Sequence, residues 1–266
     1  MSHTPDPAAE HAELLHQARR GRRLLDAAAY LTDLDLATAY LVQDRLTAMR
    51  LAEGRRPAGY KLGYTSLAMR EQMGIAAPNY GPLLDDMLLP NGAATGRFTQ
   101  PRVEPEIGLV LSGDLRGADL TVSQVAAAVG EVRACLEIVD SVWQDYRFSL
   151  EQNTADGSSA AGVVVGPAID VDPLRSETVL VVVTEADRTL ASAAGAACGH
   201  PVAGVQWLCA QLAPLGRGLH AGDLVITGGL TAAFELRPGA TITAHFNGDH
   251  TVSVSRPLLP GLDALG

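Results

Sequence analysis

The sequence lacks the features that mark membrane-spanning, disulfide-stabilised and secreted proteins. Its longest run of branched apolar residues, Val179 to Val183, is far shorter than the roughly 20 residues of a membrane-spanning helix. Its three cysteines, Cys135, Cys198 and Cys209, form no CxxC pair, which favours reduced thiols. Residues 1–13 contain neither the basic nor the apolar region of a secretory signal. We therefore expect a cytoplasmic protein with no membrane partner.

Positive charge is scarce, and lysine is almost absent. The 30 acidic and 20 basic residues give a formal net charge of −10, which repels a phosphate backbone and argues against a nucleic-acid partner. Among the 20 cationic residues only Lys61 is a lysine. Arginine stays protonated, whereas a partly desolvated lysine can lose its proton near neutral pH. Lys61 is therefore a candidate acid or base, although a chain that prefers arginine can also keep one lysine by chance.

The composition is that of a globular chain, because 47% of its 266 residues are hydrophobic and 19% are charged. Apolar spacing and capping signals predict helices over residues 8–30, 35–53, 123–134 and 202–215. Short apolar runs predict strands over residues 83–89, 103–111, 136–142, 162–165, 179–184, 224–226, 241–246 and 251–254. Strands without regularly alternating helices indicate an α+β fold, and no glycine-rich nucleotide-binding motif follows a strand.

Glu104 and Glu106 lie two residues apart in the apolar run 103–111. If this run is a strand, both carboxylates project from one face, and Pro105 between them favours an edge or irregular strand. A hard divalent cation fits such a pair, and Glu137 in the apolar run 135–140 would complete an oxygen-ligand site for magnesium or manganese. The alternative is a solvated sheet face for the first two glutamates and a helix end for Glu137.

Six short motifs occur in a recognisable order along the chain. They are GYKLGYTS at 59–66, PNYGPL at 78–83, EPE at 104–106, LEIVDS at 136–141, ADGSS at 155–159 and GHP at 199–201. On these motifs the chain resembles, over about residues 34–255, the 2-keto-4-pentenoate hydratase and 4-oxalocrotonate decarboxylase branch of the fumarylacetoacetate hydrolase superfamily. The resemblance implies a mixed-sheet β-roll behind a small helical region, divided as residues 1–57 and a catalytic domain of residues 58–266, and it implies homo-oligomers.

The resemblance also implies a site and a small 2-oxo acid substrate. Glu104, Glu106 and Glu137 would hold one Mg²⁺ or Mn²⁺, which neutralises negative charge developing on the C2 oxygen of the substrate. Lys61 would lie beside the cation, have a lowered pKa and act as the acid or base. Asp156 would orient Lys61 or a water molecule.

Four residues are expected to bind the substrate, namely Asn79, Ser158, Thr227 and Gly228. Ser158, Thr227 and the backbone at Gly228 would anchor the substrate carboxylate. Simple turn capping is the alternative for Asp156 and Thr227.

The chain departs from the resembled hydratases at Asn79. Those enzymes usually have Pro-Asp-Tyr-Gly where this chain has Pro-Asn-Tyr-Gly at 78–81, and an amide cannot act as a base. The stretches at 146–150 and 226–233 resemble decarboxylases, whereas the stretches at 83–87 and 207–208 resemble hydratases.

The sequence therefore predicts a metal-dependent lyase of a 2-oxo-enoic or 2-hydroxydienoic acid. A hydratase of a 2-hydroxypenta-2,4-dienoate-like substrate is preferred to a decarboxylase of a 4-oxalocrotonate-like diacid. A biosynthetic enzyme recruited from the same family is a further alternative. A binding protein without metal is disfavoured, because the three glutamates and Lys61 are intact.

Overall fold

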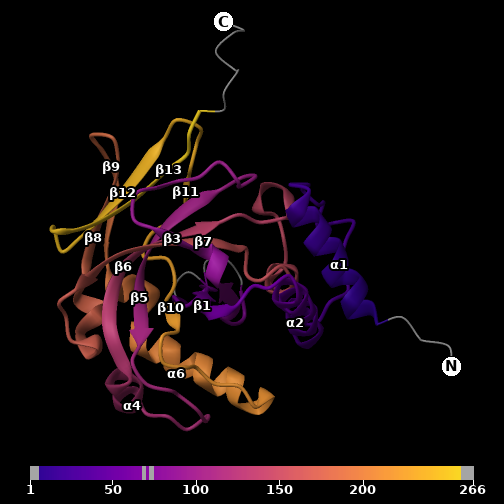
Figure 1. The fold of residues 1–266 in the computed structure, drawn as a ribbon, viewed down its shortest axis with the longest axis horizontal. Helices are drawn as coiled ribbons and strands as arrows, with labels where there is room; N and C mark the ends of the chain where they lie inside the picture. The colour runs from indigo at the N-terminus through magenta and orange to yellow at the C-terminus, as the bar shows by residue number, and fades with distance from the viewer. Residues whose placement is uncertain (1–5, 68–69, 72–74, 259–266) are drawn as a thin grey trace, which may run out of the picture.

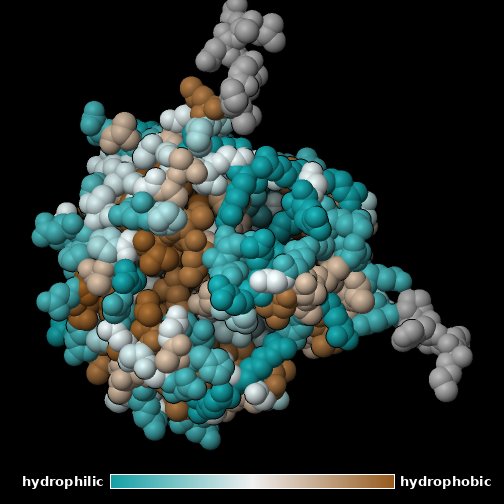
Figure 2. Space-filling view, in the orientation of Figure 1, coloured by the Kyte–Doolittle hydropathy of each residue, from teal (hydrophilic) through white to brown (hydrophobic). Residues whose placement is uncertain are grey.

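The structure is a computed structural model that describes residues 6–67, 70–71 and 75–258. An eight-stranded and a five-stranded sheet form most of it, and helices α1 and α2 lie together on one side (Figure 1). Apolar surface gathers over the sheets, whereas the N-terminal helices present a mainly polar surface (Figure 2). None of the helices in the described ranges is long and apolar enough to cross a bilayer.

The larger sheet is mixed and has the strand order β2-β1-β10-β5-β6-β7-β3, with β11 also paired to β5. Strand β1 runs parallel to β10 and β3 runs parallel to β7, while the other pairs are antiparallel. Its strands are β1 (Pro57–Gly63), β2 (Asn79–Leu84), β3 (Leu88–Pro90), β5 (Arg102–Leu111), β6 (Val129–Val139), β7 (Ala160–Ile169), β10 (Leu224–Ile226) and β11 (Phe234–Glu235).

The smaller sheet has the strand order β4-β13-β12-β8-β9. Its strands are β4 (Ala93–Ala94), β8 (Leu180–Glu185), β9 (Arg188–Ala194), β12 (Thr241–Phe246) and β13 (His250–Ser255). The main core contains fully buried side chains from both sheets, such as Ile107 and Phe246, together with Leu208 of helix α6 (Pro201–Leu212). The expected mixed sheets are therefore confirmed.

Two N-terminal helices form a second, smaller core. Helices α1 (Pro7–Arg20) and α2 (Leu36–Ala52) begin after Asp6 and Asp35, whose carboxylates accept hydrogen bonds from backbone N–H groups of the first turn. Their apolar faces pack with Trp143 and with Ala155 at the end of helix α5 (Leu150–Ala155). The expected helical N-terminal region is present, and it reaches the segment that follows strand β6.

Two predicted helices are wrong in their extent. The helix predicted over 8–30 ends at Arg20, because the chain turns at Gly21 and Leu25 N donates to the carbonyl oxygen of Val142. The helix predicted over 123–134 is the short α4 (Val122–Ala127), and strand β6 already begins at Val129. Residues 129–139 pair with β5 on one side and β7 on the other, and this pairing outweighs local helical spacing.

Pro105 lies in a central strand, so the expected edge strand is wrong. Strand β5 pairs with β6 along its whole length, and on its other side with β11 at 102–103 and β10 at 108–110. Pro105 falls between these two partners, and its carbonyl oxygen accepts from Leu230 N on that side. Its nitrogen faces the same side, so the missing N–H group removes no bond to β6.

Candidate metal and substrate site

The register between β5 and β6 brings three glutamates together. Glu104 lies directly opposite Glu137, and Glu106 follows two residues along β5. One carboxylate oxygen from each of the three lies within 4.8 Å of the others. We call Glu104, Glu106, Glu137 and the adjoining Lys61 the carboxylate cluster. Oxygen donors in this arrangement are the ligands that magnesium and manganese prefer.

The glutamates of this cluster have too few hydrogen-bond donors around them. Glu106 Oε2 accepts from Gly228 N at 2.8 Å, and Glu137 Oε2 accepts from Lys61 Nζ at 3.1 Å. Glu106 Oε1 and Glu137 Oε1 are buried and have no partner among the described residues. Burial, with the neighbouring carboxylates, raises the pKa of Glu104 to about 7 and the pKa of Glu106 well above its ordinary value. A divalent cation would coordinate the orphaned oxygens and offset the repulsion, so these residues fit one metal ion.

Lys61 enters the cluster from strand β1. Strand β1 is linked to β5 through β10, and the larger sheet brings Lys61 Nζ within 3.1 Å of Glu137 Oε2. Burial opposes the positive charge, but attraction to the three carboxylates outweighs it, so the pKa of Lys61 is raised. The lowered pKa expected for Lys61 beside a bound cation stays a prediction, because this raised pKa belongs to the protein without the cation.

A cavity of about 520 Å³ opens beside the carboxylate cluster. Lys61 and Glu104 line one part of it, and Asn153, Ser158 and Ser159 provide a neutral polar wall. The apolar part is lined by Ile75, Val139, Phe148 and Leu150. A small acid with a hydrocarbon chain matches this combination of charged, polar and apolar walls.

A second polar cluster contains the neutral wall and continues behind it. It consists of Asn79, Asn153, Asp156, Ser158 and Ser159, and we call it the amide–hydroxyl cluster. Ser158 Oγ donates to Asn79 Oδ1 at 2.9 Å, and Asn79 Nδ2 donates to Asn153 Oδ1 at 3.0 Å. Asn153 Nδ2 donates to Ser159 Oγ at 2.9 Å. Every member therefore has a hydrogen-bond partner inside the protein.

The turn that carries the two serines has an unusual backbone. Ser158 and Ser159 have φ values of 59° and 55°, in the left-handed region that costs free energy for residues other than glycine. Asp156 holds this turn, since Oδ1 accepts from Ser159 N at 2.6 Å and Oδ2 accepts from Ser141 Oγ at 3.2 Å. Burial raises the pKa of Asp156. In the structure, Asp156 therefore makes its hydrogen bonds to the turn and to Ser141, and none of them is to Lys61.

The expected substrate-binding residues are placed differently from one another. Ser158 lines the cavity, whereas Asn79 is fully buried behind it. The Thr227 hydroxyl donates to the carbonyl oxygen of Ile107 at 3.0 Å, and Gly228 N donates to Glu106. Thr227 and Gly228 therefore support strand β5 and a candidate metal ligand, and of the four only Ser158 reaches the cavity.

Sequence reasoning missed two cavity residues, Arg102 and Tyr146. The Arg102 guanidinium lies 4.1 Å from the centre of the Tyr146 ring, and both side chains line the cavity. Arg102 precedes Glu104 by two residues, so strand alternation already places both on one face. Tyr146 lies in an irregular turn with a positive φ, which no periodic pattern reveals.

Comparison with known proteins agrees with this geometry. The family described as fumarylacetoacetate (FAA) hydrolase C-terminal matches residues 58–255. The 2-keto-4-pentenoate hydratase of Paraburkholderia xenovorans (strain LB400) is 33% identical over 251 residues, which cover 92% of this chain and 93% of that protein. The 4-oxalocrotonate decarboxylase of Pseudomonas sp. (strain CF600) is 35% identical over 225 residues, which cover 83% of this chain and 85% of that protein.

A solved structure is similar over almost the whole chain. It is the 4-oxalocrotonate decarboxylase from Pseudomonas putida G7 complexed with magnesium and adipate. Its TM-score is 0.88 at 30% sequence identity, and the match covers 94% of this chain and 97% of that one. The expected fold and resemblance are confirmed. The chain belongs to the fumarylacetoacetate hydrolase family, in the branch of the 2-keto-4-pentenoate hydratases and 4-oxalocrotonate decarboxylases.

Proposed function

We propose that this chain is a divalent-metal-dependent lyase that hydrates a 2-hydroxypenta-2,4-dienoate-like acid. The observation that carries the proposal is the buried carboxylate cluster, with two orphaned oxygens and the only lysine, at the wall of a cavity sized for a small acid. The similarity to named hydratases supports the same reaction. Magnesium or manganese is the proposed ion, because all three ligands are hard oxygen donors.

Glu104, Glu106 and Glu137 would hold the ion. When bound, it supplies positive charge beside the carboxylate and C2 oxygen of the substrate, where negative charge develops during the reaction. Gly228 N fixes one oxygen of Glu106 and leaves the other free for coordination. The geometry of the three ligands is set by the two central strands, so little reorganisation is needed.

Lys61 is proposed to move a proton between Nζ and the substrate skeleton. Its ammonium group is held at the cavity wall by Glu137, with 5% of the residue exposed. A cation shared by the glutamates would weaken their hold on the Lys61 proton, which makes proton transfer near neutral pH more accessible. Asp156 and Asn79 are proposed as positioning residues, since their hydrogen bonds shape the wall that carries Ser158.

Ser158 is proposed as the neutral contact to the substrate carboxylate. Ser158 lines the cavity and its hydroxyl donates to Asn79 Oδ1, so a substrate oxygen would compete with this acceptor. Homo-oligomer formation and a cytoplasmic location are proposed along with the activity.

Decarboxylation of a 4-oxalocrotonate-like diacid is the second candidate. One residue favours it, because Asn79 stands where the resembled hydratases usually have an aspartate that can take a proton. The similar structure with a TM-score of 0.88 is a decarboxylase that holds adipate, a six-carbon diacid.

The test offers purified protein, loaded with Mg²⁺ or Mn²⁺, both 2-hydroxypenta-2,4-dienoate and 4-oxalocrotonate. Loss of dienol absorbance with formation of the hydrated product supports the hydratase. Release of carbon dioxide without hydration of the five-carbon dienol would reverse the order of the two candidates. Inertness toward both acids would refute the proposal and indicate a biosynthetic enzyme recruited from this family.

A further inference from the structure

A side chain of the first N-terminal helix reaches the backbone around the amide–hydroxyl cluster. Arg19 of α1 donates from Nη2 to the carbonyl oxygen of Asp156 at 2.8 Å and from Nη1 to that of Ala160 at 3.3 Å. These two carbonyl groups flank the turn at 157–159, which carries Ser158 at the cavity wall. The planar guanidinium fork therefore spans the base of this turn.

Gln43 of α2 makes a second connection to the same cluster. Its Nε2 group donates to the carbonyl oxygens of Tyr80 at 2.9 Å and Thr154 at 2.8 Å. Tyr80 follows Asn79 on strand β2, and Thr154 follows Asn153 on helix α5. The buried amide of Gln43 thus joins the two segments whose asparagines hydrogen-bond to each other.

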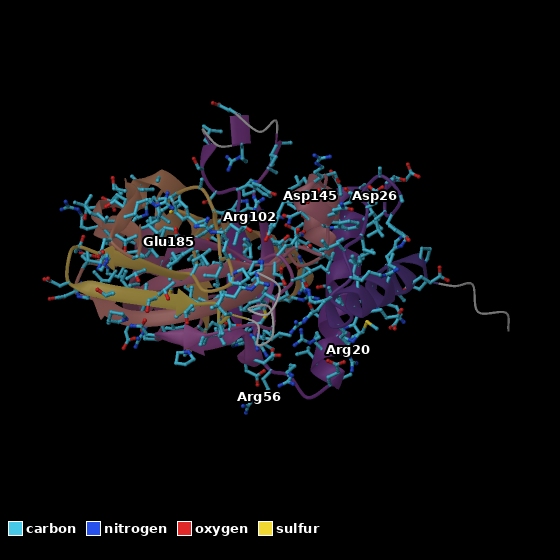
Figure 3. The ribbon with its side chains drawn as sticks, turned by 90° about the horizontal axis from the view of Figure 1, so that it is seen from above. Arg20, Asp26, Arg56, Arg102, Asp145 and Glu185 are labelled. Carbon is cyan, nitrogen blue, oxygen red and sulfur yellow. The ribbon has the colours of Figure 1, made fainter. Side chains whose placement is uncertain are left out.

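Arg19 differs in its contacts from the next arginine of the same helix. Arg20 is exposed and pairs with Glu53 at 3.1 Å. Figure 3 shows Arg20 at the outer edge of the N-terminal helices, far from Arg102 of the cavity wall. Arg19 is partly buried, donates to backbone carbonyls and, among the described residues, forms no ion pair. Burial raises the pKa of Asp156, and the positive charge of Arg19 opposes this rise.

The backbone around the turn requires such donors. Thr154 and Asp156 lie at the C-terminal end of helix α5, where the last carbonyl groups lack partners within the helix. Ser158 and Ser159 have positive φ values, and strained backbone of this kind persists only where surrounding contacts hold it. Without the donors of Arg19, the turn would be free to take other conformations.

We propose that Arg19 and Gln43 are positioning residues for substrate binding, which hold the turn at 157–159 so that Ser158 meets the substrate carboxylate. The N-terminal helices thereby form an outer layer of the substrate site rather than a separate structural unit. The inference rests on the proposed contact between Ser158 and the substrate. It does not depend on whether water is added or carbon dioxide is lost.

The metal ligands are expected to be independent of these contacts. Glu104, Glu106 and Glu137 lie on strands β5 and β6. The hydrogen bonds of Arg19 and Gln43 end instead on helix α5 and its cap, on β2 and on the first residue of β7. Loss of either side chain should therefore weaken substrate binding and leave metal binding unchanged. This split separates a positioning role from a general loss of structure.

The experiment uses calorimetry to measure the affinity of each variant for Mn²⁺, and of the Mn²⁺-loaded variant for 2-oxopentanoate, a five-carbon 2-oxo acid. Arg19→Met should weaken 2-oxopentanoate binding about 3-fold to 10-fold, the scale of one hydrogen bond, and leave the Mn²⁺ affinity within about twofold. Arg19→Lys can still donate to a carbonyl and should recover part of the loss. Gln43→Met should show the same split, and it tests the proposal from the second helix if Arg19→Met does not fold.

Arg20→Met is the matched control, because it removes the same charge from the adjacent position of α1. It should bind Mn²⁺ and 2-oxopentanoate like the wild type. Ser158→Ala should weaken 2-oxopentanoate binding, and adding Arg19→Met to it should weaken binding no further, because both substitutions act through one contact. Additive losses in the double variant would assign Arg19 a general structural role and overturn the inference.

The remaining outcomes distinguish this inference from the proposed function. Wild-type affinity for 2-oxopentanoate in Arg19→Met and Gln43→Met, with weakened binding in Ser158→Ala, would overturn the positioning role alone. Equal losses of Mn²⁺ and 2-oxopentanoate affinity in Arg19→Met would overturn it as well. Failure of the wild type to bind 2-oxopentanoate, or unchanged binding in Ser158→Ala, would refute the proposed substrate site and, with it, this inference.

Discussion

The carboxylate cluster and the amide–hydroxyl cluster border the same cavity, yet their hydrogen bonding differs. In the carboxylate cluster, Glu106 and Glu137 each keep a buried oxygen without a partner in the described structure. In the amide–hydroxyl cluster, donors and acceptors match, and Asn79 alone takes part in three hydrogen bonds. The first cluster is completed only by a ligand, whereas the second is complete within the protein.

This difference in hydrogen bonding suggests different roles: the carboxylate cluster binds a metal ion, and the amide–hydroxyl cluster positions the turn at 158–159. Buried carboxylates that repel one another lower the stability of the protein unless they coordinate a cation. The presence of three such groups therefore indicates a metal site. A closed network of neutral groups rigidifies a turn, and here it fixes the left-handed backbone of Ser158 and Ser159. Substitutions in the first cluster should therefore act on metal binding and catalysis. Substitutions in the second should act mainly on stability, except at Ser158, the proposed contact to the substrate carboxylate.

Glu106→Gln should produce the largest effect. Loss of one carboxylate ligand should weaken Mg²⁺ or Mn²⁺ binding by at least about 100-fold, since even outer partners of metal ligands contribute about 10-fold to 100-fold. Calorimetric metal titration measures it. Glu131→Gln, on the neighbouring strand β6 but exposed and paired with Arg133, is the control and should bind metal like the wild type. Unchanged metal affinity in Glu106→Gln would contradict the assignment of the ligands.

Lys61→Arg tests whether the lysine of the carboxylate cluster moves a proton or only balances charge. Arginine keeps the charge but does not deprotonate, so kcat should fall by about 100-fold or more. Steady-state kinetics with saturating metal measure this. Lys61→Met removes the charge without added bulk and should lower kcat as well. Unchanged kcat in Lys61→Arg would remove Lys61 from the reaction.

Two substitutions of Asp156 test whether this residue of the amide–hydroxyl cluster takes part in catalysis or only positions its neighbours. Asp156→Asn keeps an acceptor for Ser159 N, and the amide can donate to the hydroxyls of Ser141 and Ser159. We expect kcat to stay within about 10-fold of wild type. Asp156→Ala leaves these donors unpaired and should lower the free energy of unfolding by about 1–3 kcal/mol in urea. A 100-fold loss of kcat in Asp156→Asn at unchanged stability would instead make Asp156 a proton carrier.

The pH dependence of stability should show the smallest effect. The pKa of Glu104 is about 7 in the folded protein and the pKa of Glu106 is also raised, so both are favoured in the protonated form. The folded state binds more protons than the unfolded state, and metal-free stability should fall as pH rises from about 4.5 through 7. Metal binding requires the ionised carboxylates, so the gain in Tm on adding Mg²⁺ should be larger at pH 8 than at pH 5. A metal-free Tm that rises over this interval would contradict the burial of these groups.

Some features could be predicted because they depend on neighbouring residues. Asp35 precedes the apolar spacing of α2, and Pro201 opens helix α6, so both helix starts were predictable from local signals. Alternation on strand β5 placed Glu104 and Glu106 on one face. The same local reasoning failed at residues 129–134, where pairing on both sides makes a strand, and at Pro105, which lies between two short neighbouring strands.

The chemical groups of the site can be identified from the amino-acid sequence: two glutamates on one strand face, a third in an apolar run, one lysine and the family motifs around them. Which side chains these groups contact depends on the tertiary structure. The register sets Glu104 opposite Glu137, and the larger sheet brings Lys61 into contact with them. It also turns Asp156 toward Ser159 and places Arg102 against Tyr146. Local preferences fix the direction of a side chain along its own element, whereas its partner depends on strand register and packing between segments far apart in the chain.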